Sequence, residues 1–158
     1  MILKFTSAKD SIKNYNDSKL AKSERADCVV RAFAAAFNID YDRAHQFVKV
    51  EFQRKARCGV VRFCQSMKRL ALTKWEMDGK SIKPIIRSED TVKGFRDSKT
   101  ITVGNFVKKY NKGTYIVVIR GHAFTIKDSE VVGGNGQDAK RLRCQIKSAW
   151  QVVFADTL

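Results

Sequence analysis

Proline and long apolar runs are scarce in this chain of 158 residues, and each absence excludes a class of protein. The one proline, Pro84, excludes a proline-rich linker and a collagen-like repeat. No apolar run approaches the roughly 18 residues that cross a bilayer, so we expect no membrane segment. Lys4, Lys9 and Asp10 interrupt the apolar stretch that a secretory signal peptide needs. We therefore expect a cytoplasmic protein with a single domain over residues 1–158.

Residues that bind metals or phosphate are also few. The four cysteines are Cys28, Cys58, Cys64 and Cys144, and in the cytoplasm they are expected to be reduced thiols. Cys58 and Cys64 have five residues between them, and no second pair of Cys or His accompanies them. Zinc sites space such cysteines by roughly two to four residues. No Lys-Ser or Lys-Thr follows the glycines at 133–136, which excludes a phosphate loop. We expect neither a metal site nor another cofactor.

Acidic side chains are outnumbered, with 16 Asp and Glu against 31 Lys and Arg, which gives a net charge of +15. Residues 43–74 hold nine basic and one acidic side chain, and residues 79–120 hold ten basic and three acidic. This excess favours binding of nucleic acid through its phosphates or of an acidic host protein, although solvated helix faces give the same count. Few aromatic residues lie among these charges, so base stacking is not indicated. The candidates for this basic surface are Arg54, Lys55, Arg57, Arg62, Lys68 and Arg69.

Apolar spacing predicts helices in the first half of the chain. Residues 28–37 are apolar nearly all round and follow Asp27, a residue type that caps helices, so a buried helix is expected there. Apolar side chains three and four apart predict further helices over 41–52 and 60–72. Thr102 is expected to cap a short helix that ends near residue 110.

The second half is typical of β-structure. Residues 114–119 are β-branched and apolar, which indicates a buried strand, and Pro84 predicts that a strand over 82–86 lies at an edge. The glycines at 133–136 predict a mobile hairpin loop, and residues 1–22 are expected to be extended or loop-like. Further strands are expected over 122–127, 130–132, 141–146 and 149–154. Helices followed by strands predict an α+β fold, with N-terminal helices packed on a C-terminal antiparallel sheet.

One cysteine and one histidine are placed for chemistry. Cys28 lies in the first turn of its helix, where free N–H groups and the helix dipole favour the nucleophilic thiolate. His122 begins a strand far downstream and could accept the thiol proton. Each residue alone also fits a structural role, because cysteines on apolar helices are most often small core residues.

Several short segments resemble small phage and bacterial proteins of the papain-like cysteine peptidase fold. The matching segments are residues 26–33 (ADCVVRAF), 41–44 (YDRA), 102–106 (TVGNF), 112–117 (KGTYIV) and 120–123 (RGHA). They occur in the same order and together span residues 26–48 and 102–132. The resemblance implies a papain-like fold, with Cys28 as nucleophile and His122 as base.

The resemblance leaves two parts of the site open. Papain-like enzymes place a Gln before the cysteine to complete the oxyanion hole, but residues 21–27 contain neither Gln nor Asn. The residue that orients the histidine has three candidates, Asp128, Asn135 and Asp138, of which we favour Asn135 because adjacent glycines give it conformational freedom.

Two functions follow from these observations. The first is a cysteine peptidase or amidase that forms a thioester on Cys28 and cuts a protein or peptide, as a phage protein that modifies components of the host cytoplasm. The alternative is a catalytically degenerate papain-like scaffold that binds nucleic acid or an acidic host protein through its basic central region.

Overall fold

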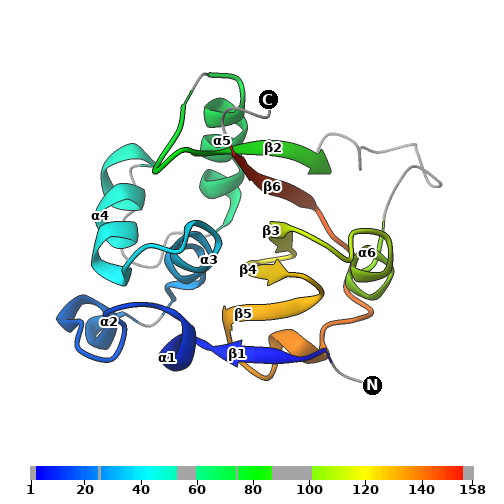
Figure 1. The fold of residues 1–158 in the computed structure, drawn as a ribbon, viewed down its shortest axis with the longest axis horizontal. Helices are drawn as coiled ribbons and strands as arrows, with labels where there is room; N and C mark the ends of the chain where they lie inside the picture. The colour runs from blue at the N-terminus through cyan, green and yellow to red at the C-terminus, as the bar shows by residue number, and fades with distance from the viewer. Residues whose placement is uncertain (1–2, 25, 53–59, 74, 87–100, 155–158) are drawn as a thin grey trace.

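The computed structural model describes residues 3–24, 26–52, 60–73, 75–86 and 101–154, and it is a mixed α+β fold (Figure 1). The helices of the first half are α1 (Ala8–Ser11), α2 (Lys19–Ser23), α3 (Cys28–Phe37), α4 (Tyr41–Glu51) and α5 (Val60–Ala71). The second half adds α6 (Val103–Lys109) and the short 3-10 helix η2 (Asp138–Lys140). The strands are β1 (Phe5–Ser7), β2 (Lys80–Ile86), β3 (Thr114–Ile119), β4 (His122–Lys127), β5 (Glu130–Gly134) and β6 (Ser148–Phe154).

The six strands form one sheet in the order β1-β5-β4-β3-β6-β2. Strands β3, β4 and β5 follow one another as an antiparallel meander, and β6 pairs with the other side of β3. The expected antiparallel sheet is corrected in one respect, because β1 runs parallel to β5. A parallel neighbour is possible here because the chain leaves β1 through several helices before it returns to the sheet.

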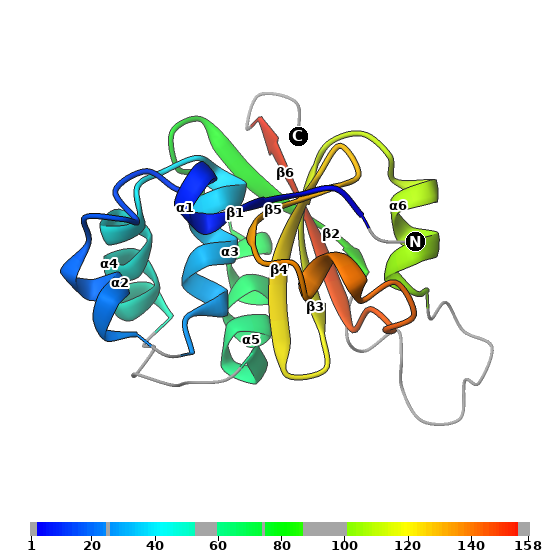
Figure 2. The ribbon, with the colours of Figure 1, turned by 90° about the horizontal axis from the view of Figure 1, so that it is seen from below.

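Helices cover both faces of this sheet (Figure 2). On β3, Ile116 and Val118 face the core around α3, whereas Tyr115, Val117 and Ile119 face a second core around α6. Burial on both faces explains why β3 is a continuous apolar run rather than an alternating one.

The helix predictions are confirmed for α3, α4, α5 and α6. Asp40 caps α4 by accepting a hydrogen bond from the Arg43 N–H, and Thr102 caps α6 in the same way through the Asn105 N–H. The prediction that Pro84 marks an edge strand is also confirmed, because β2 is the last strand of the sheet. No helix among the described residues is long and apolar enough to cross a membrane.

The prediction for residues 1–22 holds only in part, and the prediction for residues 141–146 is wrong. The first segment forms β1, α1 and the start of α2, since β1 gains its partner far along the chain (Phe5 opposite Val131). In the second, the carbonyls of Leu142 and Cys144 accept hydrogen bonds from the N–H groups of Gly104 and Val103. The segment therefore satisfies the N-terminus of α6 instead of adding a strand.

The glycines at 133–136 do not form the predicted hairpin loop. Gly133 and Gly134 are buried at the end of β5. Gly133 has a φ of +78°, and a Cβ placed on it would lie 2.7 Å from the Ala35 side chain. Glycine is required here because α3 packs closely against the backbone of β5.

Candidate active site

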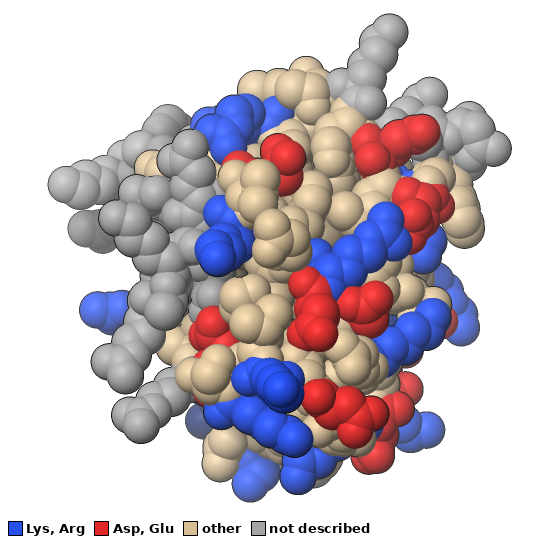
Figure 3. All heavy atoms as spheres, turned by 90° about the vertical axis from the view of Figure 1, so that its left-hand side faces the viewer, with Lys and Arg blue, Asp and Glu red and all other residues tan. Residues whose placement is uncertain are grey.

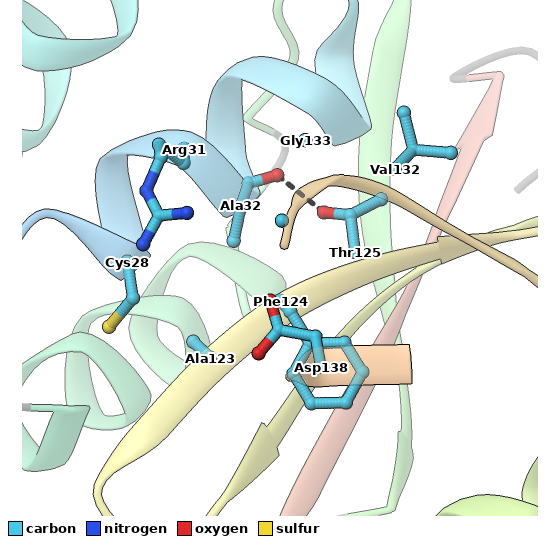
Figure 4. Close-up of a pocket in the computed structure, with 10 residues that line it drawn as sticks. Cys28, Arg31, Ala32, Ala123, Phe124, Thr125, Val132, Gly133 and Asp138 are labelled. Atoms are coloured by element: carbon cyan, nitrogen blue, oxygen red, sulfur yellow. Dashed lines mark hydrogen bonds between the residues drawn. The ribbon is translucent and has the colours of Figure 1, made fainter. Parts of the chain in front are cut away.

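Cys28 is the first residue of α3, and its side chain is half-buried. Most of α3 is buried against the sheet, as the apolar run predicts. The Thr125 hydroxyl of β4 donates a buried hydrogen bond of 2.6 Å to the Ala32 carbonyl (Figure 4). This bond ties the helix that carries Cys28 to the strand that carries His122.

His122 is the first residue of β4, and its side chain is 19% exposed. Its Nε2 lies 2.6 Å from Oδ1 of Asp138, a carboxylate that is only 1% exposed. The other carboxylate oxygen of Asp138 accepts a hydrogen bond from the Asn135 backbone N–H at 3.2 Å. The Phe124 ring stacks on the imidazole, with the ring centres 5.7 Å apart. The ring is thus held from two sides.

The structure brings the side chains of Cys28 and His122 together, so that each shifts the pKa of the other through a hydrogen bond and through charge. Because Nε2 of the imidazole faces Asp138, Nδ1 is the nitrogen that remains for the thiol. The Ala123 backbone N–H is a second donor to the sulfur. Strand β5 pairs with β4 only from Thr125 onwards, so within the described part of the chain the first residues of β4 have no strand neighbour on that side.

The surroundings of Cys28 favour the thiolate. Burial raises the pKa of Cys28, but the hydrogen bonds from His122 and Ala123 and the positive charges of His122 and Arg31 outweigh it, so its pKa is lowered. Cys64 provides a contrast within the same chain, because burial raises its pKa to about 11. Two thiols of similar exposure are therefore tuned in opposite directions.

The same interactions stabilise the protonated imidazole. Burial lowers the pKa of His122, but the hydrogen bonds to Asp138 and Cys28 and their negative charges raise it to about 9. Burial likewise raises the pKa of Asp138, and the hydrogen bond and charge of His122 lower it overall. A lowered thiol pKa beside a raised imidazole pKa favours a thiolate–imidazolium pair.

The residue that contacts the histidine is Asp138, which corrects the preference for Asn135. The Asn135 side-chain oxygen accepts hydrogen bonds from the backbone N–H groups of Gln137 and Asp138, so it shapes the turn. Asp128, the third candidate, follows the far end of β4 and accepts a hydrogen bond from the Gly113 N–H. Asn135 thus contacts the Asp138 carboxylate through its backbone N–H, at the oxygen that does not bind His122.

The prediction that the Asp27 side chain caps α3 is wrong. Its carboxylate makes no cap bond to the helix, and it binds Arg31 and Tyr41 instead. The N–H groups of the first turn of α3, beside the sulfur, are therefore not occupied by this side chain. Arg31 is not among the site residues expected from the sequence, although its place one turn after Cys28 puts it on the same side of the helix.

A small hollow lies behind the sulfur, between α3, β4, β5 and η2. Cys28, Arg31 and Asp138 are among its lining residues, and it has no room for a water molecule. Figure 4 shows the Cys28 sulfur pointing away from the other lining residues.

Most of the predicted basic surface lies outside the described residues. Arg54, Lys55 and Arg57 fall there entirely, and so does the side chain of Arg62. Lys68 and Arg69 are exposed on α5, and Arg69 donates a hydrogen bond to the carbonyl of Glu51. The side of the molecule that carries α2 and α4 presents both basic and acidic side chains (Figure 3).

Cys58 also lies outside the described residues, which leaves the Cys58–Cys64 pair undescribed. Among the residues that the structure does describe, no three His, Cys, Asp or Glu side chains are grouped as metal ligands. Comparison with protein-family models, with curated proteins and with solved structures found no match to this chain. Function is therefore inferred from the arrangement of Cys28, His122 and Asp138.

Proposed function

We propose that this protein is a papain-like cysteine hydrolase, a peptidase or amidase that acts through a thioester on Cys28. The observation that carries the proposal is the chain of contacts from Cys28 through His122 to Asp138. The resemblance of the segments around Cys28 and His122 to papain-like peptidases supports the same assignment. A helix N-terminus supplies the nucleophile and a strand of the packed sheet supplies the histidine, which fits that architecture.

Each residue has a defined part in the reaction. The Cys28 thiolate attacks the carbonyl carbon of the scissile amide, and the carbonyl oxygen becomes an oxyanion. The imidazolium of His122 then gives its proton to the leaving amine as the C–N bond breaks, which leaves the thioester. His122 next takes a proton from water, whose hydroxide attacks the thioester and releases the acid and the thiolate. Asp138 holds the ring throughout and stabilises its positive charge whenever the ring is protonated.

The oxyanion would be stabilised by backbone groups. The free N–H groups in the first turn of α3 lie beside the sulfur and are not taken up by Asp27. Residues 21–27 supply no side-chain amide for a second donor. Loss of one such donor costs about 10²–10³ in rate, so we expect a slower enzyme than one with a complete oxyanion hole.

The test is the rate at which each cysteine reacts with iodoacetamide at pH 7, followed by peptide mass spectrometry. We expect Cys28 to react faster than Cys64, because a lowered pKa gives Cys28 more thiolate and a raised pKa gives Cys64 less. Substitution His122→Ala should remove the advantage of Cys28. The matched control His45→Ala should preserve it, since His45 is bonded to Glu24 on another pair of helices. Equal rates for Cys28 and Cys64 would contradict the hydrolase.

The alternative, a degenerate scaffold that binds nucleic acid or an acidic protein, is favoured by the net charge of +15 and the exposed Lys68 and Arg69. It predicts binding that weakens steeply as salt is raised. Absence of binding to single- or double-stranded nucleic acid at low salt would remove nucleic acid as the partner.

A further inference from the structure

A buried carboxylate lies immediately before the nucleophile. Asp27 is 7% exposed, and both of its oxygens are occupied. Oδ1 accepts a hydrogen bond from Nε of Arg31 at 3.0 Å, and Oδ2 accepts one from the Tyr41 hydroxyl at 2.7 Å. Tyr41 is fully buried at the start of α4. A negative charge this close to Cys28 would by itself disfavour the thiolate, so its pairing matters for the site.

The pairing fixes the position of Arg31. Its side chain is 17% exposed, and its Nε is held by Asp27. Arg31 also lines the hollow that contains Cys28 and Asp138, and Figure 4 shows its guanidinium above the Cys28 side chain. Burial raises the pKa of both Cys28 and Asp138, whereas His122 and backbone hydrogen bonds lower it, and the positive charge of Arg31 adds a smaller effect in the lowering direction.

We propose that Arg31 is a positioning residue that stabilises the Cys28 thiolate by its charge, and that Asp27 and Tyr41 hold its guanidinium in place. Nothing in this role requires contact with the substrate. It rests on the proposed function, because it assumes that Cys28 is an activated thiolate.

The geometry explains why three residues are involved. The guanidinium of an unrestrained arginine would extend into water, where its effect on the thiol is screened. The bond to Asp27, one helical turn before Arg31, keeps the charge over the site. Tyr41 in turn satisfies the second carboxylate oxygen from a different helix, so the arrangement depends on the packing of α3 against α4. The site is thereby coupled to an element that contributes no catalytic residue.

The experiment measures the rate of Cys28 alkylation by iodoacetamide between pH 4 and pH 10. Substitution Arg31→Met should move the profile to higher pH and slow alkylation on its acidic limb, because the thiolate loses a nearby positive charge. Arg31→Lys keeps the charge and should recover part of the loss. Tyr41→Phe should give a smaller shift in the same direction, and no further shift in the Arg31→Met background.

The matched control is Arg43→Met, which breaks an exposed arginine–aspartate pair with Asp78 and should leave the Cys28 profile unchanged. A purely structural role for Arg31 would lower the melting temperature of Arg31→Met without moving the profile, and that result would overturn the proposal. Failure of the proposed function is distinguishable, because Cys28 of the unsubstituted protein would then react no faster than Cys64.

Discussion

Replacing Asp138 with asparagine removes one negative charge and keeps an acceptor of similar shape beside His122. The substitution isolates the effect of that charge, because Oδ1 of Asp138 lies 2.6 Å from Nε2 of the imidazole. The imidazolium would lose the carboxylate whose hydrogen bond does most to raise its pKa. We expect Asp138→Asn to lower the pKa of His122 and to weaken the thiolate–imidazolium pair.

The size of the effect follows from the structure. The pKa of His122 is raised from 6.5 to about 9 against the opposing effect of burial. A shift of this size corresponds to about 3 kcal/mol between the two protonation states. Because Cys28 contributes to the shift and the ring is 19% exposed, we assign about 2 kcal/mol to Asp138. That value predicts an equilibrium constant for forming the ion pair about thirtyfold lower, and the proposed hydrolysis should slow by at most the same factor.

The assay is a pH titration of the histidine ring signals by NMR. The chain has two histidines, so the signal of His45 serves as an internal reference. The matched control is Asn135→Ala, which alters the turn that precedes η2 and keeps the carboxylate. Asp138→Asn should lower the titration midpoint of His122 by well over one unit, and Asn135→Ala by much less. Superimposed curves for Asp138→Asn and the unsubstituted protein would refute the reasoning.

Two further predictions concern the same site. Because the raised pKa keeps His122 protonated below about 9, the negatively charged reagent iodoacetate should lose its rate advantage over neutral iodoacetamide as pH rises through that value. A ratio of the two rates that is constant from pH 7 to pH 10 would contradict the ion pair. Gly134→Ala should abolish the fast alkylation of the thiol, because its Cβ would collide with the Asp138 carboxylate. Gly136→Ala meets only ordinary contacts and should react as the unsubstituted protein does.

Local patterns were sufficient for most of the regular elements. The apolar run of α3 predicts a buried helix, and the β-branched run of β3 predicts a buried strand, each within a few residues. Local patterns also place Cys28 at the N-terminus of α3 and His122 at the start of β4, which is enough to suggest a Cys–His pair. The short β1 was missed because its stability comes from pairing with β5, far along the chain.

The remaining site residues depend on contacts that no local pattern contains. Asp27 resembles a helix cap in sequence, but its partners include Tyr41 on the next helix. Asp138 reaches His122 because Gly134 permits a close approach of its carboxylate. Asn135 was preferred because Gly133 and Gly134 were expected to give it conformational freedom. In the structure these two glycines instead leave space for Ala35 and Asp138 to pack closely.

The order of strands in the sheet also sets when the site can form during synthesis. Thr125 and Ala32 are joined by a hydrogen bond across 93 residues, and α3 leaves the ribosome long before β4. Strand β2 cannot join the sheet until β6, near the end of the chain, has paired between it and β3. Contacts of such long range slow folding. The nascent protein therefore carries an ordinary thiol at Cys28, whose pKa is lowered only once the fold places His122 beside it.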